Sequence, residues 1–392
     1  MSDRRTDLLI IGAGPFGLAL AAEAQHRGID HLVVGRPMEF WQRHMPAGMF
    51  LRSGCDWHLD PTGEHTVARY LATRRLSSAD VEPLSLQFYL DYTAWFQERT
   101  RIAPVPAYVK RLDGAECPGG PRTHPTRLVA VLEDGTRVSA SHAAVAVGFE
   151  YFTNQPPALV DRLPAGRFSH TCHLVDFSGL SGRRCLILGG RQSAYEWAAL
   201  LREAGAAAVH VVHRHESPAF RAADWSWVLP LVDHIVEEPA WFRRLSAPAR
   251  RELEQRLWAE GRLKVEPWLE SRVLREPVRI WPQRALDDCE VGRGGDLLVT
   301  LDDGTRLTVD HVVLATGYKV RAPRVPFLAQ GNLGARIAVH GGFPVLDDQM
   351  QTTVPGLYAT SMMAMRDMGP FFAFTVSARA SARVIGAAVG HV

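Results

Sequence analysis

The sequence has few cysteines, and they follow no pattern of a metal or redox site. The five cysteines are Cys55, Cys117, Cys172, Cys185 and Cys289. None forms a C-x-x-C pair, and no group of histidines and cysteines has the spacing of metal ligands. An odd number of isolated thiols is typical of a reducing compartment. We therefore expect a cytoplasmic protein without a metal site or a redox-active disulfide.

An excess of charge of either sign is also absent. The 44 basic and 42 acidic residues leave a net charge of +2, and lysine occurs only at Lys110, Lys264 and Lys319. The other basic residues are arginines scattered in ones and twos, which argues against a surface that follows a phosphate backbone. No uninterrupted apolar run is long enough to cross a bilayer. The sequence thus predicts neither a nucleic-acid nor a membrane partner.

The strongest motif that is present lies near the N-terminus. Residues 7–11 (DLLII) are typical of a buried strand, and Gly12, Gly14 and Gly17 then form G-x-G-x-x-G before an Ala/Leu-rich helix. In such a unit the first glycine makes the turn, the second admits a pyrophosphate, and the third lets the helix pack on the strand. The helix N-terminus then faces the phosphates. The predicted phosphate-binding turn comprises Gly12, Ala13, Gly14, Pro15, Phe16 and Gly17.

The acid that usually holds a ribose hydroxyl is missing after the second predicted strand, residues 31–34. Gly35 and Arg36 stand there, and Glu39 is the nearest acid that can substitute. Residues 40–60 are rich in aromatic residues, Met and Gly, and have little periodicity. We expect a long functional loop there, followed by a helix at 83–99.

A second strand–turn–helix unit begins near the middle of the chain. A strand is predicted at 185–188, a helix at 193–202, and a further strand at 209–212 that closes on His213 and Arg214. Two such units in one chain predict two dinucleotide sites. The second turn comprises Gly189, Gly190, Arg191, Gln192, Ser193 and Ala194.

These elements predict an α/β fold with two Rossmann-like dinucleotide-binding domains, the second inserted into a discontinuous first. Pro156 and Pro157 mark the first crossing, and residues 310–318 are expected to return the chain to the first domain. Hairpins are predicted around residues 133–135 and 302–304, a buried strand at 143–147, a loop at 354–360, and a last helix at 375–388. The predicted domains are residues 1–155, residues 156–300 with a helical insertion at 225–285, and residues 301–392.

The order of these motifs resembles the class B flavoprotein monooxygenases, meaning the flavin-containing monooxygenases and especially the ornithine and lysine N-hydroxylases. The resemblance rests on the N-terminal G-x-G-x-x-G, on GGRQSAYEWA at 189–198, on D-x-x-x-L-A-T-G-Y-x-x-x-x-P from Asp310 and on VPGLYAT at 354–360. The loop around Trp41, His44 and Met49 is similar to the aromatic-His-Gly-Met loop of the N-hydroxylases. The resemblance covers nearly the whole chain.

The resemblance implies FAD on residues 1–155 and 301–392, and NADPH on residues 156–300. NADPH would pass a hydride to the flavin, O2 would add at flavin C4a, and the resulting (hydro)peroxide would give one oxygen to the substrate. The cofactor carries the redox chemistry, while the protein positions the reactants and excludes water. This mechanism needs neither a catalytic triad nor a metal.

Three departures from the family pattern bear on the second site. Arg191 replaces the middle glycine, so it either crowds the pyrophosphate or reaches over it as a cation. We favour retained binding because the rest of the turn is intact. Arg214 stands where an acid would select NADH, and suits a 2′-phosphate, although a plain surface arginine is the alternative. The Baeyer–Villiger fingerprint is incomplete: Phe168 and His170 are present, the glycine is missing, and His173 is off by one position.

Candidate site residues come from the loops. Arg52, Trp57 and His58 are predicted to be catalytic near the flavin ring, with a buried structural histidine as the alternative for His58. Trp225, Trp227, Phe371 and Phe372 are predicted to bind substrate, with core packing as the alternative. Beyond the two turns, the predicted cofactor contacts are Gly35, Arg36, Glu39, Trp41, Arg52, Ser53, Val109, Gly148, His213, Arg214, Thr316, Gly317, Tyr318, Met368, Gly369 and Phe371.

The sequence thus predicts an FAD- and NADPH-dependent monooxygenase that hydroxylates a small aromatic, N-heterocyclic or amine substrate with O2. A purine such as urate would fit, whereas ornithine and lysine are not favoured because their binding pattern is not found. The alternatives are an NAD(P)H-dependent flavin reductase without oxygen insertion, a Baeyer–Villiger-type oxygenation and a non-catalytic flavin-binding protein. Oligomers remain compatible with the sequence.

Overall fold

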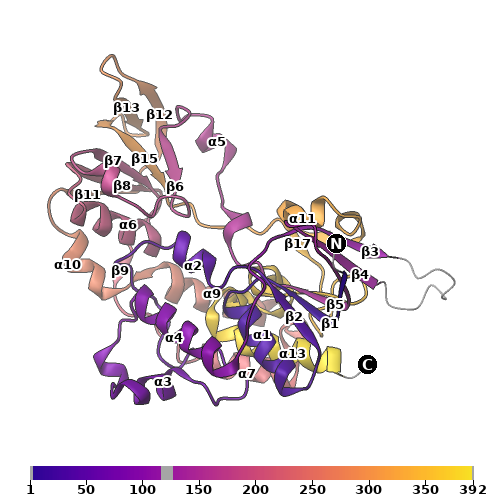
Figure 1. Ribbon diagram of the computed structural model, residues 1–392. Helices are drawn as coiled ribbons and strands as arrows, with labels where there is room; N and C mark the ends of the chain where they lie inside the picture. Colours follow the sequence, from indigo (N-terminus) through magenta and orange to yellow (C-terminus); the bar gives the residue numbers. More distant parts are fainter. Residues whose placement is uncertain (1–2, 116–126, 391–392) are drawn as a thin grey trace.

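The structure is a computed structural model that describes residues 3–115 and 127–390, and it is a mixed α/β fold with two main sheets (Figure 1). In the first sheet the order is β2-β1-β5-β4-β3, and β18 pairs with the far end of β5. Strand β1 is parallel to β2 and β5, while β3, β4 and β5 are antiparallel neighbours. The strands are β1 (Asp3–Ile11), β2 (His31–Val34), β3 (Val109–Ala115), β4 (Arg127–Leu132), β5 (Arg137–Val145) and β18 (Leu357–Ala359).

The second sheet is entirely parallel, in the order β11-β8-β7-β15-β6. Alternate residues of β7 serve two cores: Cys185 and Ile187 pack with helix α6, whereas Leu186 and Leu188 pack with the antiparallel sheet β12-β13-β14. Burial on both faces explains why β7 reads as a continuous apolar run. The elements are β6 (Phe168–His170), β7 (Arg184–Leu188), α6 (Gln192–Glu203), β8 (Ala208–His213), β11 (Val278–Pro282), β12 (Leu286–Val291), β13 (Leu297–Leu301), β14 (Arg306–Val309) and β15 (His311–Leu314).

The expected boundary between residues 300 and 301 is wrong. Strands β14 and β15 belong with the second sheet, where β15 pairs with both β6 and β7. The chain changes lobes just after β15, where residues 316–319 run beside residues 152–154. The Asn154 N–H donates to the Gly317 carbonyl at 2.9 Å and the Lys319 N–H to the Phe152 carbonyl at 2.7 Å. The outgoing and returning segments therefore form one paired junction.

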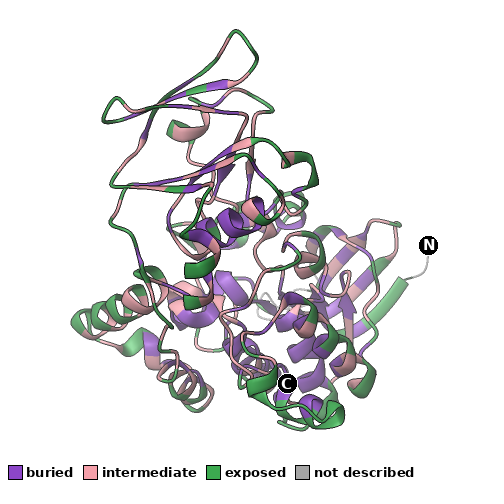
Figure 2. Ribbon diagram, turned by 90° about the vertical axis from the view of Figure 1, so that its left-hand side faces the viewer, coloured by how far each residue is buried: buried purple, intermediate pink, exposed green. Residues whose placement is uncertain are grey.

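The position of the insertion at 225–285 also differs from the prediction, which assigns these residues to the second domain. It contains α7 (Val228–Glu237), α8 (Trp241–Arg244) and α9 (Ala247–Arg262), and it ends in β11 of the second sheet. The apolar face of α7, residues Val228, Val232 and Ile235, joins the core around the first sheet. These three are the buried residues of α7, whereas α9 has none. Figure 2 shows the buried residues gathered in the interior of the molecule and the exposed ones on its outer helices and loops. An amphipathic helix must bury its apolar face, and here helix α13 (Ala378–Gly390) receives that of α7.

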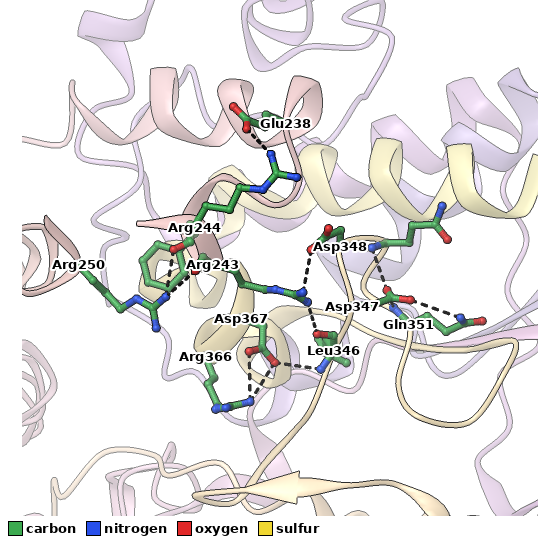
Figure 3. A network of polar contacts seen from close by, with 12 residues as sticks. Glu238, Arg243, Arg244, Arg250, Leu346, Asp347, Asp348, Gln351, Arg366 and Asp367 are labelled. Atoms are coloured by element: carbon green, nitrogen blue, oxygen red, sulfur yellow. Dashed lines mark hydrogen bonds and ion pairs between the residues drawn. The ribbon is translucent and has the colours of Figure 1, made fainter. Parts of the chain in front are cut away.

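Polar contacts tie the same insertion to the C-terminal part of the chain (Figure 3). Arg243 of α8 donates to the Leu346 carbonyl at 2.6 Å and pairs with Asp348 at 3.0 Å. Asp367 accepts from the Leu346 N–H at 2.9 Å, and Arg366 pairs with Asp367. The insertion therefore packs on the first lobe although its ends connect to the second.

Several local elements match the predicted pattern, and two do not. Helix α1 (Pro15–His26), helix α4 (Leu86–Thr100) and the β13–β14 hairpin are confirmed. Residues 137–145 form one strand, β5, rather than one strand of a hairpin followed by a separate strand. Residues 357–359 form strand β18 rather than a loop. The other elements are α2 (Glu39–Arg43), α3 (Val67–Arg74), α5 (Pro157–Val160), β9 (Ala219–Phe220), β10 (Lys264–Val265), α10 (Glu270–Val273), α11 (Pro326–Ala329), β16 (Val339–His340), β17 (Phe343–Pro344) and α12 (Met365–Met368). Among the described residues, no helix is both long and apolar enough to cross a membrane.

Candidate functional site

The first glycine turn is shaped by contacts that leave no room for side chains. Gly12 has φ +116°, and a Cβ there would overlap the Ala146 carbonyl oxygen at the end of β5. A Cβ on Gly17 would overlap the Gly12 carbonyl, so α1 crosses β1 closely. Gly14 faces open space and precedes α1 with no side-chain cap. The first N–H groups of α1 are thus available to an anion.

A cavity of about 310 Å³ opens from this turn. Its walls combine the glycine turn, the end of β2, the start of β3 and the loop after α2. The predicted cofactor contacts that line it are Gly12, Ala13, Gly14, Pro15, Phe16, Gly35, Arg36, Glu39, Trp41, Arg52, Ser53, Val109 and Gly148. Their binding of a cofactor stays a prediction, but they converge on one space.

The acid missing after β2 is replaced by a charged cluster at the edge of this cavity. Arg36 pairs with Glu39 at 3.3 Å and lies over the Tyr108 ring at 4.6 Å. The Tyr108 hydroxyl donates to the other oxygen of Glu39, and burial raises the pKa of Tyr108 to about 12. The Glu39 carboxylate is therefore held from two sides, where a ribose hydroxyl would need an acceptor. Tyr108 was not predicted, because nothing in the sequence marks the residue before β3.

Aromatic rings form the other end of the cavity. Trp57 stacks on Phe374 with ring centroids 6.0 Å apart, and Trp225 meets the same Phe374 at 5.4 Å. Ser53 and Thr375 also line this end, and their hydroxyl oxygens lie 3.3 Å apart. The prediction for Trp57 and Trp225 thus agrees in position with the cavity, whereas Phe374 and Thr375 were missed.

Arg52 lies at this aromatic end but is already engaged. Its guanidinium donates to Glu266 at 2.7 Å and to the Gly261 and Glu260 carbonyls at 3.1 and 3.2 Å. Those carbonyls belong to the last turn of α9, which Arg52 caps. The geometry favours a positioning role that holds α9 beside the cavity, with the guanidinium 5.3 Å from the centre of the Trp225 ring.

Four predicted site residues lie away from the cavity lining of the described chain. His58 is held by Arg379 at 2.9 Å, and burial lowers the pKa of His58 to about 4. Phe371 and Phe372 are fully buried in the core. Trp227 donates its indole N–H to the Asp224 carbonyl and lies under Arg256. The substrate-binding assignment is therefore corrected to core packing for Phe371 and Phe372 and to a cation–π contact for Trp227.

Two segments of the C-terminal part that are predicted to contact the flavin, residues 316–318 and 368–369, also lie away from the cavity lining. Met368 is fully buried and Gly369 has φ +117° before a short turn, and the segment that follows lines the cavity at Ala373, Phe374 and Thr375. Thr316 and Gly317 bond to Asn154 in the junction between lobes, and Tyr318 packs on Phe149 there. These residues hold the two lobes together rather than line the cavity.

The second glycine turn repeats the first on β7 and α6. Gly189 has φ +143°, and a Cβ there would overlap the Ala315 carbonyl after β15. A Cβ on Gly190 would overlap the His213 ring. Arg191 has the same extended backbone as Gly14, with φ −115° against −85°, and each residue precedes its helix. The residue after β8, Arg214, is exposed.

The Arg191 side chain is directed toward α9. Its guanidinium donates to the Arg262 carbonyl and lies 5.0 Å from the centre of the Trp258 ring. The last turn of α9 is therefore capped by two arginines, Arg52 from the first lobe and Arg191 from the second. Three predicted cofactor contacts follow Arg191 in the second turn. The Gln192 side chain accepts a hydrogen bond from the Glu266 N–H at 3.0 Å, Ser193 is exposed and Ala194 is buried.

Two glycine turns, each between a parallel strand and a helix, define a class of protein that binds two nucleotides. The chain belongs to the family described as L-lysine 6-monooxygenase/L-ornithine 5-monooxygenase, whose model matches residues 4–320. The expectation that the chain belongs with the ornithine and lysine N-hydroxylases among the class B flavoprotein monooxygenases is thereby confirmed.

The fold is similar to that of solved N-hydroxylases. The reduced ornithine hydroxylase from Pseudomonas aeruginosa has a TM-score of 0.76 at 17% identity, over 98% of this chain and 99% of that one. An ornithine N-hydroxylase from Kutzneria sp. 744, solved with reduced FAD, NADP⁺ and L-ornithine, has a TM-score of 0.75 at 15% identity, over 99% of each chain.

A curated relative has a different activity. Ferredoxin–NADP reductase 1 from Cupriavidus necator is 29% identical over 227 residues, which are 56% of this chain and 55% of the relative. The chain thus spans about half the length of the curated relatives it matches.

Proposed function

We propose that the chain is a monooxygenase with FAD in the cavity of the first turn and NADPH at the second turn. In this proposal the lobes are two Rossmann-like domains, and the FAD domain is discontinuous, with residues 156–314 inserted. The observation that carries the proposal is the first turn, whose glycines are required by contacts and whose α1 N-terminus opens on the cavity. A bare backbone and a free helix N-terminus fit a pyrophosphate.

Bound FAD, reduced by NADPH, supplies the electrons that activate O2. The residues of the chain do the rest by binding and by exclusion of water. Glu39 would accept a hydrogen bond from a ribose hydroxyl, and the N–H groups of the first turn of α1 would donate to the pyrophosphate. Trp57, Trp225 and Phe374 keep water from the reacting end of the cavity, because buried aromatic rings offer it no partner.

The substrate in this proposal is a small molecule with an oxidisable nitrogen on an aromatic or heterocyclic body. The family supports an amine as the group oxidised, and the three rings at the cavity end support a flat apolar body. Arg52, the cation that lines this end, has its N–H groups engaged by Glu266 and α9. An amino acid such as ornithine would need a free cation for its carboxylate.

The test is single-turnover oxidation of the NADPH-reduced, flavin-loaded protein by O2, with and without candidate amines of both kinds. The proposal expects one equivalent of hydroxylated product from an aromatic or heterocyclic amine and little from ornithine or lysine. Product from ornithine alone would overturn the substrate class. Hydrogen peroxide alone with every amine would contradict the substrate range that the aromatic walls support.

The curated relatives favour one second candidate, an NADPH-dependent flavin reductase that inserts no oxygen. The same experiment separates the two. A reductase would pass electrons from NADPH through the flavin to an external acceptor at a higher rate than to O2. It would form no hydroxylated product.

A further inference from the structure

Three potential metal ligands meet at the junction between the two lobes. His44 follows α2 in the first lobe, and Cys172 and His173 follow β6 in the second. One ligand atom from each residue lies within 4.8 Å of the others. His44 lies 128 positions before Cys172 in the sequence. The spacing of the residues along the chain could therefore not have predicted this cluster.

The local hydrogen bonds prepare His44 to bind a cation. Its Nδ1 lies 2.8 Å from the Cys172 carbonyl oxygen, which can only accept, so Nδ1 carries the proton. In the neutral imidazole the other nitrogen, Nε2, then has a free lone pair. A histidine that donates one N–H to a backbone carbonyl and presents the other nitrogen is the usual arrangement at zinc sites.

A fourth ligand is available from the crossing segment. The Glu150 carboxylate lies 3.8 Å from His44 Nε2. Ligands bound to one tetrahedral zinc ion lie roughly 3.3–3.8 Å apart, given bonds of about 2.0–2.3 Å. The ligand atoms of His44, Cys172 and His173 therefore need a closure of at most about 1.0–1.5 Å from the 4.8 Å limit. Glu150 lies outside that group of three, and its partly exposed side chain must turn toward the ion to bind it.

We propose that His44, Cys172, His173 and Glu150 form a zinc site that joins the two lobes at their junction. Cysteine, histidine and carboxylate ligands in fours suit zinc rather than calcium or magnesium. Binding converts the Cys172 thiol to a thiolate and releases its proton to solvent.

The site goes beyond the proposed oxygenation, because His44, Cys172 and His173 lie outside the lining of the cavity, whereas Glu150 belongs to it. Its consequence is mechanical. The ion would fix α2 and the crossing segment of the first lobe to the loop after β6 of the second, beside the paired strands at 152–154 and 316–319. Zinc would thereby restrain rotation of one lobe against the other.

The test is equilibrium dialysis of the full flavin-loaded chain against zinc, with metal analysis and thermal unfolding. The inference expects one zinc ion per chain and a Tm that rises with zinc concentration. His173→Ala, an exposed substitution, and Cys172→Ser should each weaken binding roughly tenfold or more. Cys289→Ser is the matched control, because Cys289 is a buried thiol of β12, and it should bind zinc as the unaltered chain does.

Equal zinc binding in the unaltered chain and in His173→Ala would overturn the inference, and so would a Tm that does not respond to zinc. If Cys172→Ser fails to fold, His173→Ala alone decides. Cobalt in place of zinc gives a second readout, since thiolate-bound cobalt in a tetrahedral site absorbs at wavelengths longer than flavin does. The result does not depend on whether the protein oxygenates a substrate.

Discussion

The two glycine turns share one backbone and differ in what stands around it. Gly12 and Gly189 both have a positive φ, +116° and +143°, and both approach a carbonyl closely, of Ala146 and Ala315 respectively. At the third position of the turn the first unit has Gly14 and the second has Arg191. After the next strand the first unit has Gly35 and the second has Arg214. Beneath the first turn β2 ends in Val34, and beneath the second β8 ends in His213.

This difference teaches how one supersecondary unit is adapted to two nucleotides. The first turn opens on a cavity lined by residues from many parts of the chain, which suits a cofactor that stays bound. The second turn has two arginines close to solvent, which suits a nucleotide that arrives, is held by its phosphates and leaves. Substitutions at matched positions in the two turns therefore separate flavin binding from hydride delivery.

The largest effect is expected from alanine at the first glycine of each turn. Gly12→Ala places a Cβ on the Ala146 carbonyl at φ +116° and should abolish flavin binding, at a cost on the order of 3 kcal/mol in stability. Gly189→Ala makes the same collision with Ala315, yet it should retain flavin and lose reduction by NADPH. Flavin content after purification and anaerobic reduction rates measure the two effects.

The control for this pair is Gly179→Ala, because a Cβ there meets open space. It should bind flavin and react with NADPH normally. Loss of flavin in Gly189→Ala together with normal reduction in Gly12→Ala would reverse the assignment of the two turns.

A smaller effect is expected from Arg214, the counterpart of Gly35. Arg214→Ser removes the cation that we place at the 2′-phosphate, and a charge-assisted bond is worth about 1.5–3 kcal/mol. The KM for NADPH should rise about 10- to 100-fold, and the KM for NADH should stay within about twofold. Steady-state kinetics with both nucleotides measure this. An equal change for both would show that Arg214 does not contact the 2′-phosphate.

Arg191, the counterpart of Gly14, should have a weaker influence. Arg191→Gly removes a cation at the N-terminus of α6 and a cap of α9, so the KM for NADPH should rise several-fold, or about 1 kcal/mol, with flavin content unchanged. Arg191→Lys retains the charge and should restore much of the loss. A lower KM in Arg191→Gly would show instead that the arginine crowds the pyrophosphate.

The last effect concerns the stability of the fold rather than nucleotide binding, and it involves His213, the counterpart of Val34. Burial, with help from His215, lowers the pKa of His213 to about 4 in the folded protein. Between pH 6.5 and about 4 the unfolded chain therefore binds the extra proton, and the free energy of unfolding falls as the pH is lowered. His213→Val should reduce this fall by on the order of 2 kcal/mol, as measured by urea unfolding from pH 7 to pH 4. An unchanged pH dependence would show that His213 is not the group responsible.

The sequence predicted what is encoded locally. Both turns, their strands and their helices follow from glycine spacing next to an apolar run and an Ala/Leu-rich segment. The tight packing at Gly12 and Gly189 is the reason that the motif has glycine there. The prediction was correct because each unit carries its own geometric requirement.

The remaining parts depend on pairings that the sequence does not state. Strand β15 has the same short apolar pattern whichever sheet it joins, so the boundary at residue 300 was wrong. Helix α7 shows an amphipathic face but not the helix that receives it. A short turn decides that Phe374, rather than Phe371 or Phe372, faces the cavity. Cys172 and His44 meet only because the chain crosses between lobes beside them.

The proposed function depends on one step, the transfer of a hydride from NADPH at the second turn to FAD at the first. Anaerobic titration of the flavin-loaded protein with NADPH tests it directly, with loss of the yellow flavin absorbance as the signal. We predict complete bleaching by one equivalent of NADPH, and slow or no bleaching by NADH. A flavin that dithionite reduces but NADPH leaves yellow would contradict the account.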